Sequence, residues 1–254
     1  MDRKSYKLTI EKSGCTPFNC PSCGNGVLKV QQGSFSYHET KLSRCSRRHE
    51  AFGFEWVSYV FSCILECTNP RCQEFVSCLG NGGVDQEYST DENGEFDVSY
   101  SDFFKPKFFH PNLKIFTPPK KTPESVYEEL NVSFSLVFSD PSSAANHVRI
   151  ALENLLTELR IKRSYKTSGK MKYLNLHQRI DLLPSKFDHI KLLFYAVKWL
   201  GNAGSHSHKE LSFDDVFDAY EIISQILEEI YNNKGKQIAT MAKVINKRKG
   251  PRCR

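Results

Sequence analysis

From residue 122 onward, apolar residues recur every three or four positions, which is the period of an amphipathic helix. Helices are expected to start at Thr122-Pro123-Glu124, at Asp140-Pro141 and at Ser212-Phe213-Asp214-Asp215, where caps, prolines and acidic residues gather. A short helix should stop at Pro184, and a longer apolar one should end at Gly201. Four or five such helices with short links predict an antiparallel bundle.

The first 80 residues instead contain short β-branched and aromatic runs between turn residues. Strands are expected at 27–30, 54–63 and 73–79. Gly80-Asn81-Gly82-Gly83 should then break the strand pattern, leaving the acidic segment that follows as a loop or ragged hairpin. Phe103–Phe116 holds five Phe and two Pro, so we expect an extended crossover whose rings pack on a neighbouring domain.

Composition is that of a folded protein, with 39% hydrophobic and 25% charged residues. The first residues have no apolar segment behind them, and the longest apolar stretch, Val57–Leu65, is too short to span a bilayer. We therefore expect a cytoplasmic protein with no membrane partner.

The net charge of +6 is concentrated at the C-terminus. After Asn232 there is no Asp or Glu but a series of basic residues: Lys234, Lys236, Lys243, Lys247, Arg248, Lys249, Arg252 and Arg254. Such a tail can bind RNA, DNA or an acidic partner, or it can be a solvated extension. A second basic run, 160–172, has the same two interpretations.

Cysteines are paired at metal-binding spacings. Cys20-Pro21-Ser22-Cys23-Gly24 is a zinc knuckle by spacing, and Cys67-Thr68-Asn69-Pro70-Arg71-Cys72 should supply the second half. Four thiolates, from Cys20, Cys23, Cys67 and Cys72, would close a tetrahedral shell around a structural Zn²⁺ and leave no position open for chemistry. Cys63 remains an alternative to Cys67 or Cys72, and the other cysteines are expected to be ordinary thiols.

Three stretches together resemble a known family. They are His147-Val148-Arg149-Ile150-Ala151-Leu152-Glu153-Asn154-Leu155-Leu156, then Leu176-His177-Gln178-Arg179-Ile180-Asp181-Leu182-Leu183, then Lys198-Trp199-Leu200-Gly201-Asn202-Ala203-Gly204-Ser205-His206. Their order and spacing look like domain-of-unknown-function family 4145, over roughly 123–231, and members often carry an N-terminal zinc ribbon.

That family is similar to the HEPN superfamily of helical domains in bacterial immunity and restriction-associated proteins. Its catalytic members cleave RNA without metal, using an Arg-polar-x-x-x-His motif assembled across a dimer. Asn202 matches the polar position and His206 the histidine, but Gly201 stands where the Arg would be. Lys198, one turn earlier, or Arg149 from a neighbouring helix are the candidate replacements.

The residues themselves leave two interpretations of this segment open. A His of near-neutral pKa can move the proton of a ribose hydroxyl while a cation stabilises charge on phosphorus. Alternatively, Gly201 ends the helix in a left-handed conformation, Asn202 caps it and His206 bonds into the bundle. Arg149 and Glu153, one turn apart, should form an ion pair unless Arg149 reaches toward His206.

The resulting fold class is α+β, with a small zinc-ribbon β-domain over 1–116, a HEPN-like antiparallel helical bundle over 117–232 and a basic tail over 233–254. We favour a module that binds nucleic acid or a protein partner, dimerises through the bundle and acts in bacterial defence or restriction. The alternative is a metal-independent endoribonuclease centred on His206 and Asn202.

Overall fold

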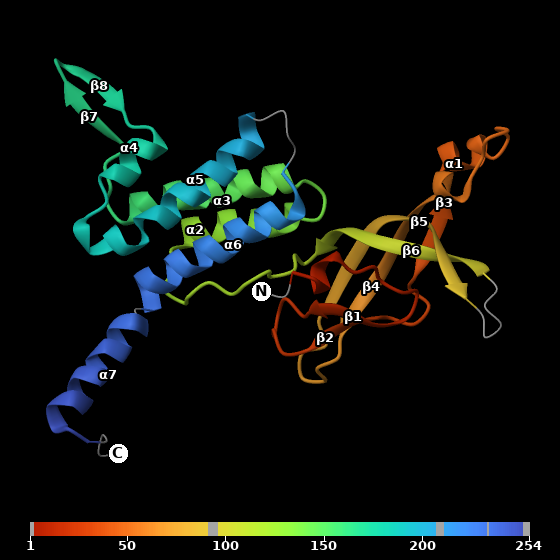
Figure 1. Cartoon of the computed structure of the whole chain (residues 1–254), viewed down its shortest axis with the longest axis horizontal. Coiled ribbons are helices and arrows are strands. Elements are labelled where there is room, and N and C mark those ends of the chain that lie inside the picture. The colour runs from red at the N-terminus through yellow and green to blue at the C-terminus, as the bar shows by residue number, and fades with distance from the viewer. Residues whose placement is uncertain (1–2, 91–95, 207–210, 233, 251–254) are drawn as a thin grey trace. The chain divides into compact units, whose positions relative to one another are not determined.

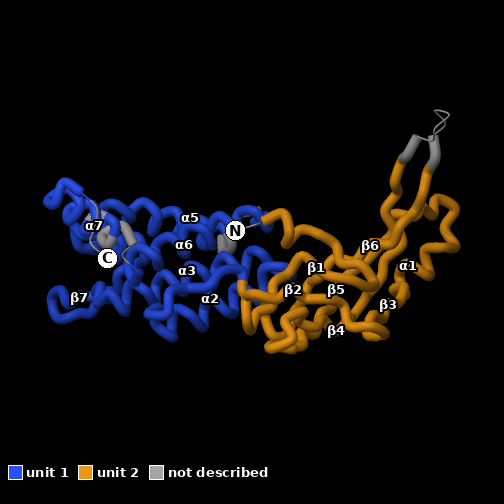
Figure 2. The backbone as a smooth tube through the Cα atoms, turned by 90° about the horizontal axis from the view of Figure 1, so that it is seen from below, with its two compact units in different colours: residues 1, 115–254 blue, residues 2–114 orange. Residues whose placement is uncertain are grey.

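The computed structural model describes residues 3–90, 96–206, 211–232 and 234–250. The chain divides into two compact units, the β unit (residues 2–114) and the helical unit (residues 115–254), coloured separately in Figure 2. An antiparallel sheet forms the first and helices form most of the second (Figure 1), which confirms the α+β class. Within the described residues, no helix combines the length and apolar character needed to cross a bilayer.

The β unit is a curled antiparallel sheet (Figure 1). Its strands are β1 (Gly14–Asn19), β2 (Val27–Val30), β3 (Ser36–Glu39), β4 (Ser58–Cys67), β5 (Phe75–Thr90) and β6 (Phe96–His110). They are ordered β1-β2-β4-β5-β6, and β3 also pairs with β4. One edge of β4 is therefore shared, because Leu65–Cys67 pair with β2 and Tyr59–Ser62 pair with β3. A short helix, α1 (Lys41–Ser46), follows β3.

The glycine-rich segment does not break the sheet, contrary to the sequence expectation. β5 continues through Gly80 and Gly82, which pair with Pro106 and Phe104 of β6, and its pairing register shifts between Leu79 and Gly80. A Cβ on Gly80 would lie 2.2 Å from the carbonyl oxygen of Lys105, and one on Gly82 would lie 2.8 Å from the Cδ1 atom of Phe104. These glycines make room for neighbouring backbone and rings, a use of glycine inside a strand that turn statistics do not reveal.

The aromatic segment after residue 103 is also a strand rather than a crossover up to His110. Phe104 and Pro106, two positions apart, face the core of the β unit, and Phe109 also faces it because a shift in the pairing register after Pro106 changes the alternation. The Phe104 ring packs edge-on against Phe61, and the Phe109 ring packs edge-on against Phe18. These two rings were expected to pack on a neighbouring domain, and instead they fill the core of their own unit. Phe116, the last ring of the same segment, belongs to the helical unit and packs edge-on against Phe134 there.

The helical unit contains five longer helices, one short helix and one hairpin among its described residues. Its elements are α2 (Glu124–Leu136), α3 (Pro141–Glu158), β7 (Ser164–Thr167), β8 (Lys170–Tyr173), α4 (Leu176–Asp181), α5 (Lys191–His206), α6 (Phe213–Leu227) and α7 (Lys234–Arg248). A 3-10 turn, Ser185–Ile190, precedes α5, and a π-helical turn, Glu228–Asn232, links α6 to α7.

Helix starts agree with the caps in the sequence, with one exception. The Asp140 carboxylate accepts from the backbone N–H of Ser143 at 2.9 Å, and Ser212 forms a reciprocal capping box with Asp215. At α2 the cap position is Pro123 instead of Thr122. The Thr122 hydroxyl is buried without a hydrogen-bond partner among the described residues, so it does not cap the helix.

The core of the helical unit is built around α3, which packs against α2, α5 and α6. Its apolar face matches the period seen in the sequence, and Val148, Leu152 and Leu155 are fully buried. One polar link crosses this core: the Tyr220 hydroxyl on α6 donates to Ser133 Oγ on α2 at 2.7 Å, and Ser133 Oγ donates to the Ala144 carbonyl at 2.8 Å.

Gly201 does not end α5. The helix continues to His206, and Gly201 is buried within it without a left-handed backbone. A Cβ there would lie 2.4 Å from the Cβ of Arg149 and 3.1 Å from the carbonyl oxygen of Ala145, both on α3. The glycine therefore allows α5 and α3 to approach closely, which replaces the expected capping role with a packing role.

Two further segments differ from expectation. The basic run 160–172, for which no strand was expected, forms most of the hairpin β7–β8. The basic C-terminal segment contains the helix α7, which exposes Ile238, Met241 and Ile245 at helical spacing.

Candidate functional site

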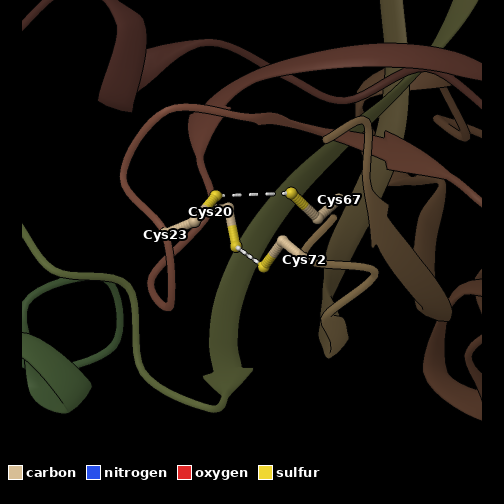
Figure 3. Close-up of side chains that lie close together, drawn as sticks. All are labelled: Cys20, Cys23, Cys67 and Cys72. Carbon is tan, nitrogen blue, oxygen red and sulfur yellow. Dashed lines mark hydrogen bonds between the residues drawn. The ribbon is translucent and has the colours of Figure 1, made fainter. Parts of the chain in front are cut away.

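Four cysteine sulfurs meet at one end of the β unit. The Sγ atoms of Cys20, Cys23, Cys67 and Cys72 all lie within 4.8 Å of one another, and Figure 3 shows them converging from two loops. The sulfurs of Cys20 and Cys72 are 3.8 Å apart, and those of Cys23 and Cys67 are 3.7 Å apart. A disulfide would need about 2.0 Å. Thiolates on a tetrahedral zinc ion, with Zn–S bonds of about 2.3 Å, lie about 3.8 Å from each other.

Each cysteine pair sits in a tight turn between two strands. Cys20 and Cys23 lie between β1 and β2, where the N–H of Gly24, in a left-handed backbone (φ +67), donates to the Cys20 carbonyl at 2.9 Å. Cys67 ends β4 and Cys72 precedes β5, with the N–H of Cys72 donating to the Asn69 carbonyl at 2.9 Å. The two hairpins thus present their sulfurs at neighbouring turns.

The surroundings of Cys23 suit the negative charge of a thiolate, whereas burial and the neighbouring cysteines raise the pKa of the thiols of Cys67 and Cys72. Backbone N–H groups of Gly26 and Asn69 donate to the Sγ atoms of Cys23 and Cys67, both at 3.4 Å. The N–H groups of Asn25 and Gly26 lower the pKa of Cys23 to about 6. Gly26 is required sterically as well, because a Cβ there would lie 2.4 Å from Cys67 Sγ. The donor set therefore fits a borderline or soft divalent metal ion.

The remaining cysteines lie elsewhere. Cys63 on β4 stands directly opposite Cys78 on β5, both buried, and neither belongs to the group of four. Cys15 and Cys45 are exposed, and Cys253 falls outside the described residues.

The helical unit has an open pocket of about 500 Å³ between α3, α4 and α5. Its lining consists of Arg149, Glu153, Leu174, Asn175, Leu176, His177, Lys198 and Asn202. Three of the four residues selected from the sequence, Arg149, Lys198 and Asn202, are thus brought together. The fourth, His206, ends α5, and its side chain lies outside the part of the chain that the structure describes.

Lys198 is the most unusual residue of the pocket. It is only 8% exposed, and its Nζ atom lies 3.4 Å from Nδ1 of His177 and 3.4 Å from the ring centroid of Trp199. An ammonium group is stabilised by both an imidazole acceptor and an aromatic face. These contacts hold the lysine head in a fixed position at the pocket wall.

His177 was not selected as a site residue from the sequence, although it lies in the second family block. Its Nε2 atom is 3.8 Å from Asp181 one turn later, and Asp181 also accepts a hydrogen bond from Tyr195, which raises the pKa of Tyr195 to about 12. When Nδ1 of His177 accepts from Lys198, the proton of the neutral ring stands on Nε2, on the side of Asp181. The sequence feature that could have identified His177 is its spacing of four from Asp181 on a short helix, which brings the two side chains together.

Arg149 is held differently. Its guanidinium donates to Glu153 one turn along α3, which confirms the expected ion pair, and to the side-chain oxygen of Asn146 at 3.2 and 3.1 Å. Glu153 partly neutralises Arg149, whereas the contacts of Lys198 described above are with neutral groups. Lys198 therefore contributes the less compensated positive charge to the pocket.

Comparison with protein families places this pocket in a recognised domain. Residues 131–248 match a domain of unknown function, DUF4145. The family expected from the three sequence blocks is therefore confirmed for this part of the chain. Residues 8–109 match a second domain of unknown function, DUF8608. No curated protein and no solved structure matches the chain.

The DUF4145 match begins and ends later than the expected 123–231. It covers α3 to α6, so that every residue lining the pocket falls inside it. It also includes α7 and ends at Arg248, so Lys249, Arg252 and Arg254 of the basic segment lie beyond it. All four cysteines of the cluster lie in the DUF8608 region.

Proposed function

We propose that this protein is a nucleic-acid-binding module in which a zinc-ribbon-like β unit, held by one structural Zn²⁺, accompanies a HEPN-like helical unit that binds a phosphate group in its pocket. The observation that carries the proposal is the convergence of Lys198 and Arg149 with the side chains of Asn202 and His177 in one open pocket. Two cations and polar donors around one opening are suited to a phosphate of a nucleic-acid backbone.

The zinc assignment is supported by the four-thiolate donor set and by sulfur separations near the edge of a zinc–thiolate tetrahedron. Zinc in this position would lock the two turns together and supply folding free energy without taking part in a reaction. Metal analysis of the purified full chain should give one zinc per chain. The double substitution Cys20→Ser/Cys23→Ser should abolish it, whereas Cys45→Ser, at an exposed cysteine outside the cluster, should retain it. A chain without metal, or one that binds iron, would contradict this assignment.

Phosphate binding is tested by charge removal at the pocket. Fluorescence anisotropy with labelled RNA and DNA oligonucleotides, measured over a range of salt concentrations, gives the affinity and its salt dependence. Lys198→Met keeps a long side chain in the buried position and removes the ammonium group, and Arg149→Met removes the guanidinium. Each should weaken binding to all sequences and reduce the slope of log affinity against log salt by about 1.

Lys121→Met is the matched control, because Lys121 is an exposed lysine of the helical unit that does not line the pocket. It should leave affinity and slope unchanged. The proposal fails if the wild-type chain binds neither RNA nor DNA at low salt, or if the pocket and control variants behave alike.

The endoribonuclease function has one observation in its favour: the pocket contains a histidine, His177, in contact with the cation Lys198. In such a reaction a base takes the proton of the ribose 2′-hydroxyl and the 2′-oxygen bonds to phosphorus. The bond from phosphorus to the 5′-oxygen breaks, and that oxygen leaves with a proton. The products are a 2′,3′-cyclic phosphate and a 5′-hydroxyl end.

Cleavage of end-labelled RNA in the presence of a chelator tests this second function. His206→Ala or His177→Ala should abolish cleavage while leaving the melting temperature close to that of the wild type, and the variant that loses activity identifies the histidine that transfers a proton. Equal cleavage by wild type and both variants would exclude both histidines as the catalytic base or acid.

A further inference from the structure

The hairpin β7–β8 extends from the helical unit without a core of its own (Figure 1). None of the residues in its two strands is buried, although they include Tyr165, Met171 and Tyr173. An isolated two-stranded hairpin gains little stability in water. Its side chains are thus available for contacts outside the fold.

The charge of this hairpin is entirely of one sign. No Asp or Glu occurs between Glu158 and Asp181, and the hairpin and its base expose four basic residues: Arg163, Lys166, Lys170 and Lys172. This gives a positive, solvated surface suited to polyanions.

The pairing register sorts these side chains onto two faces. Tyr165 stands opposite Lys172, and the Lys172 ammonium lies 6.0 Å from the centroid of the Tyr165 ring. Thr167 and Lys170 form the next pair on the same face. Tyr173 pairs with Ser164 and belongs to the opposite face.

The hairpin face that carries Tyr165 is continuous with the lining of the pocket through Leu174. The N–H of Leu174 donates to the Arg163 carbonyl at 2.9 Å, which continues the ladder by one pair. By the alternation of a strand, Leu174 shares the face of Lys170 and Lys172. Leu174 and the residues directly after it, Asn175 to His177, line the pocket.

We propose that this face and the pocket form one continuous binding track for single-stranded nucleic acid, a proposal that rests on the proposed function and names its substrate class. Tyr165 stacks on an unpaired base, Lys170 and Lys172 neutralise backbone phosphates, and Lys198 and Arg149 hold a further phosphate in the pocket. An exposed aromatic ring flanked by lysines favours single strands, since only an unpaired base offers its face for stacking.

Direct binding measurements on the full chain test the track. Anisotropy is measured with a labelled 12-nucleotide RNA, the DNA of the same sequence and the 12-base-pair duplex. One or both single strands should bind more tightly than the duplex. Tyr165→Ala should weaken single-strand binding by about 5- to 150-fold, the effect of losing one stacked base, with little change for the duplex. Tyr165→Phe retains the ring and should bind like the wild type.

Tyr173→Ala is the matched control, because it removes the same side chain from the other face of the same hairpin. It should leave single-strand affinity within twofold of wild type. A duplex preference would indicate that the hairpin enters a DNA groove and would overturn the proposal. Equal effects of Tyr165→Ala and Tyr173→Ala would also overturn it.

The two proposals fail in different ways. If the wild-type chain binds no nucleic acid, the proposed function itself is wrong. If Lys198→Met weakens binding but Tyr165→Ala does not, the pocket stands and only the hairpin track is wrong. Thermal melting of each variant confirms that the exposed substitutions leave the fold intact.

Discussion

Gly201 on α5 and Arg149 on α3 pack so closely that a Cβ on the glycine would lie 2.4 Å from the Cβ of the arginine. This contact sets the distance between the two helices that carry the pocket cations Arg149 and Lys198. A residue that looked like a helix breaker in the sequence is therefore part of what shapes the pocket.

Gly201→Ala should destabilise the helical unit. Alanine gains up to about 1 kcal/mol of helix propensity over glycine. The forced separation of the helices should cost more, roughly 1–3 kcal/mol, as for other overpacked cores. Urea denaturation measures the difference in free energy of unfolding between the variant and the wild type. Gly250→Ala is the control, because a Cβ on Gly250 would lie 3.8 Å from its nearest neighbouring atom. An unchanged or increased stability of Gly201→Ala would show that the helices adjust freely.

Two glycines beside the cysteines should respond differently to alanine. A Cβ on Gly26 would lie 2.4 Å from Cys67 Sγ, so Gly26→Ala should displace a sulfur and reduce the metal content of the purified chain. Gly24 has a left-handed backbone and open space around it, so Gly24→Ala should retain the metal and lose only about 1–2 kcal/mol from backbone strain. Metal content and chelator-dependent melting distinguish the two, and equal metal loss in both variants would be inconsistent with this steric argument.

The buried hydrogen bond between Tyr220 and Ser133 predicts that removing either hydroxyl destabilises the fold, but by different amounts. Ser133→Ala leaves the fully buried Tyr220 hydroxyl without its acceptor and should cost roughly 1–3 kcal/mol. Tyr220→Phe should cost only about 1 kcal/mol, because Ser133 keeps its bond to Ala144. The double variant should be less destabilised than the sum of the two, as measured by denaturant unfolding. Strict additivity would mean that the two hydroxyls do not interact.

The cap of α3 predicts a pH-dependent stability. Hydrogen bonds from the Ser143 side chain and backbone hold the pKa of Asp140 below its usual range. A carboxyl whose pKa is depressed by folding stabilises the fold above its unfolded pKa of about 3.9, and that contribution is lost as pH falls through the lower folded value. Asp140→Ala should therefore lower the free energy of unfolding by about 1 kcal/mol near pH 7. Denaturant unfolding at several pH values should show the difference between the variant and the wild type becoming smaller below about pH 4. A difference in free energy of unfolding that stays constant down to about pH 2 would show that the carboxylate charge does not contribute to stability.

Local signals in the sequence identified local structure. The strand Val27–Val30, the Asp140 and Ser212 caps and the cysteine cluster were all predictable, because each depends on residues a few positions apart or on spacing alone. Thr122 shows the limit of such signals, since Pro123 took the cap position that a threonine usually fills.

The misplaced features depend on contacts between distant residues. Whether Gly80 or Gly201 breaks an element is decided by Phe61, Lys105 and Arg149, which the sequence does not place beside them. The hairpin β7–β8 has no buried face, so its sequence carries no sustained alternation of apolar and polar residues, which is the pattern that predicts a strand. His177 joined the pocket because α4 packs beside α5, bringing its ring to Lys198.

The sulfur cluster also has a consequence for the order in which the β unit assembles. Each cysteine pair closes a short local turn, whereas Cys23 and Cys67, whose sulfurs meet, are 44 positions apart. Closing a longer stretch of chain costs more entropy, and a bound ion offsets that cost as a reversible crosslink. If the cluster holds a metal ion as proposed, the two turns can form early and independently, while their joining is favoured by the ion. With zinc as the proposed ion, refolding of this unit should then accelerate as free zinc rises.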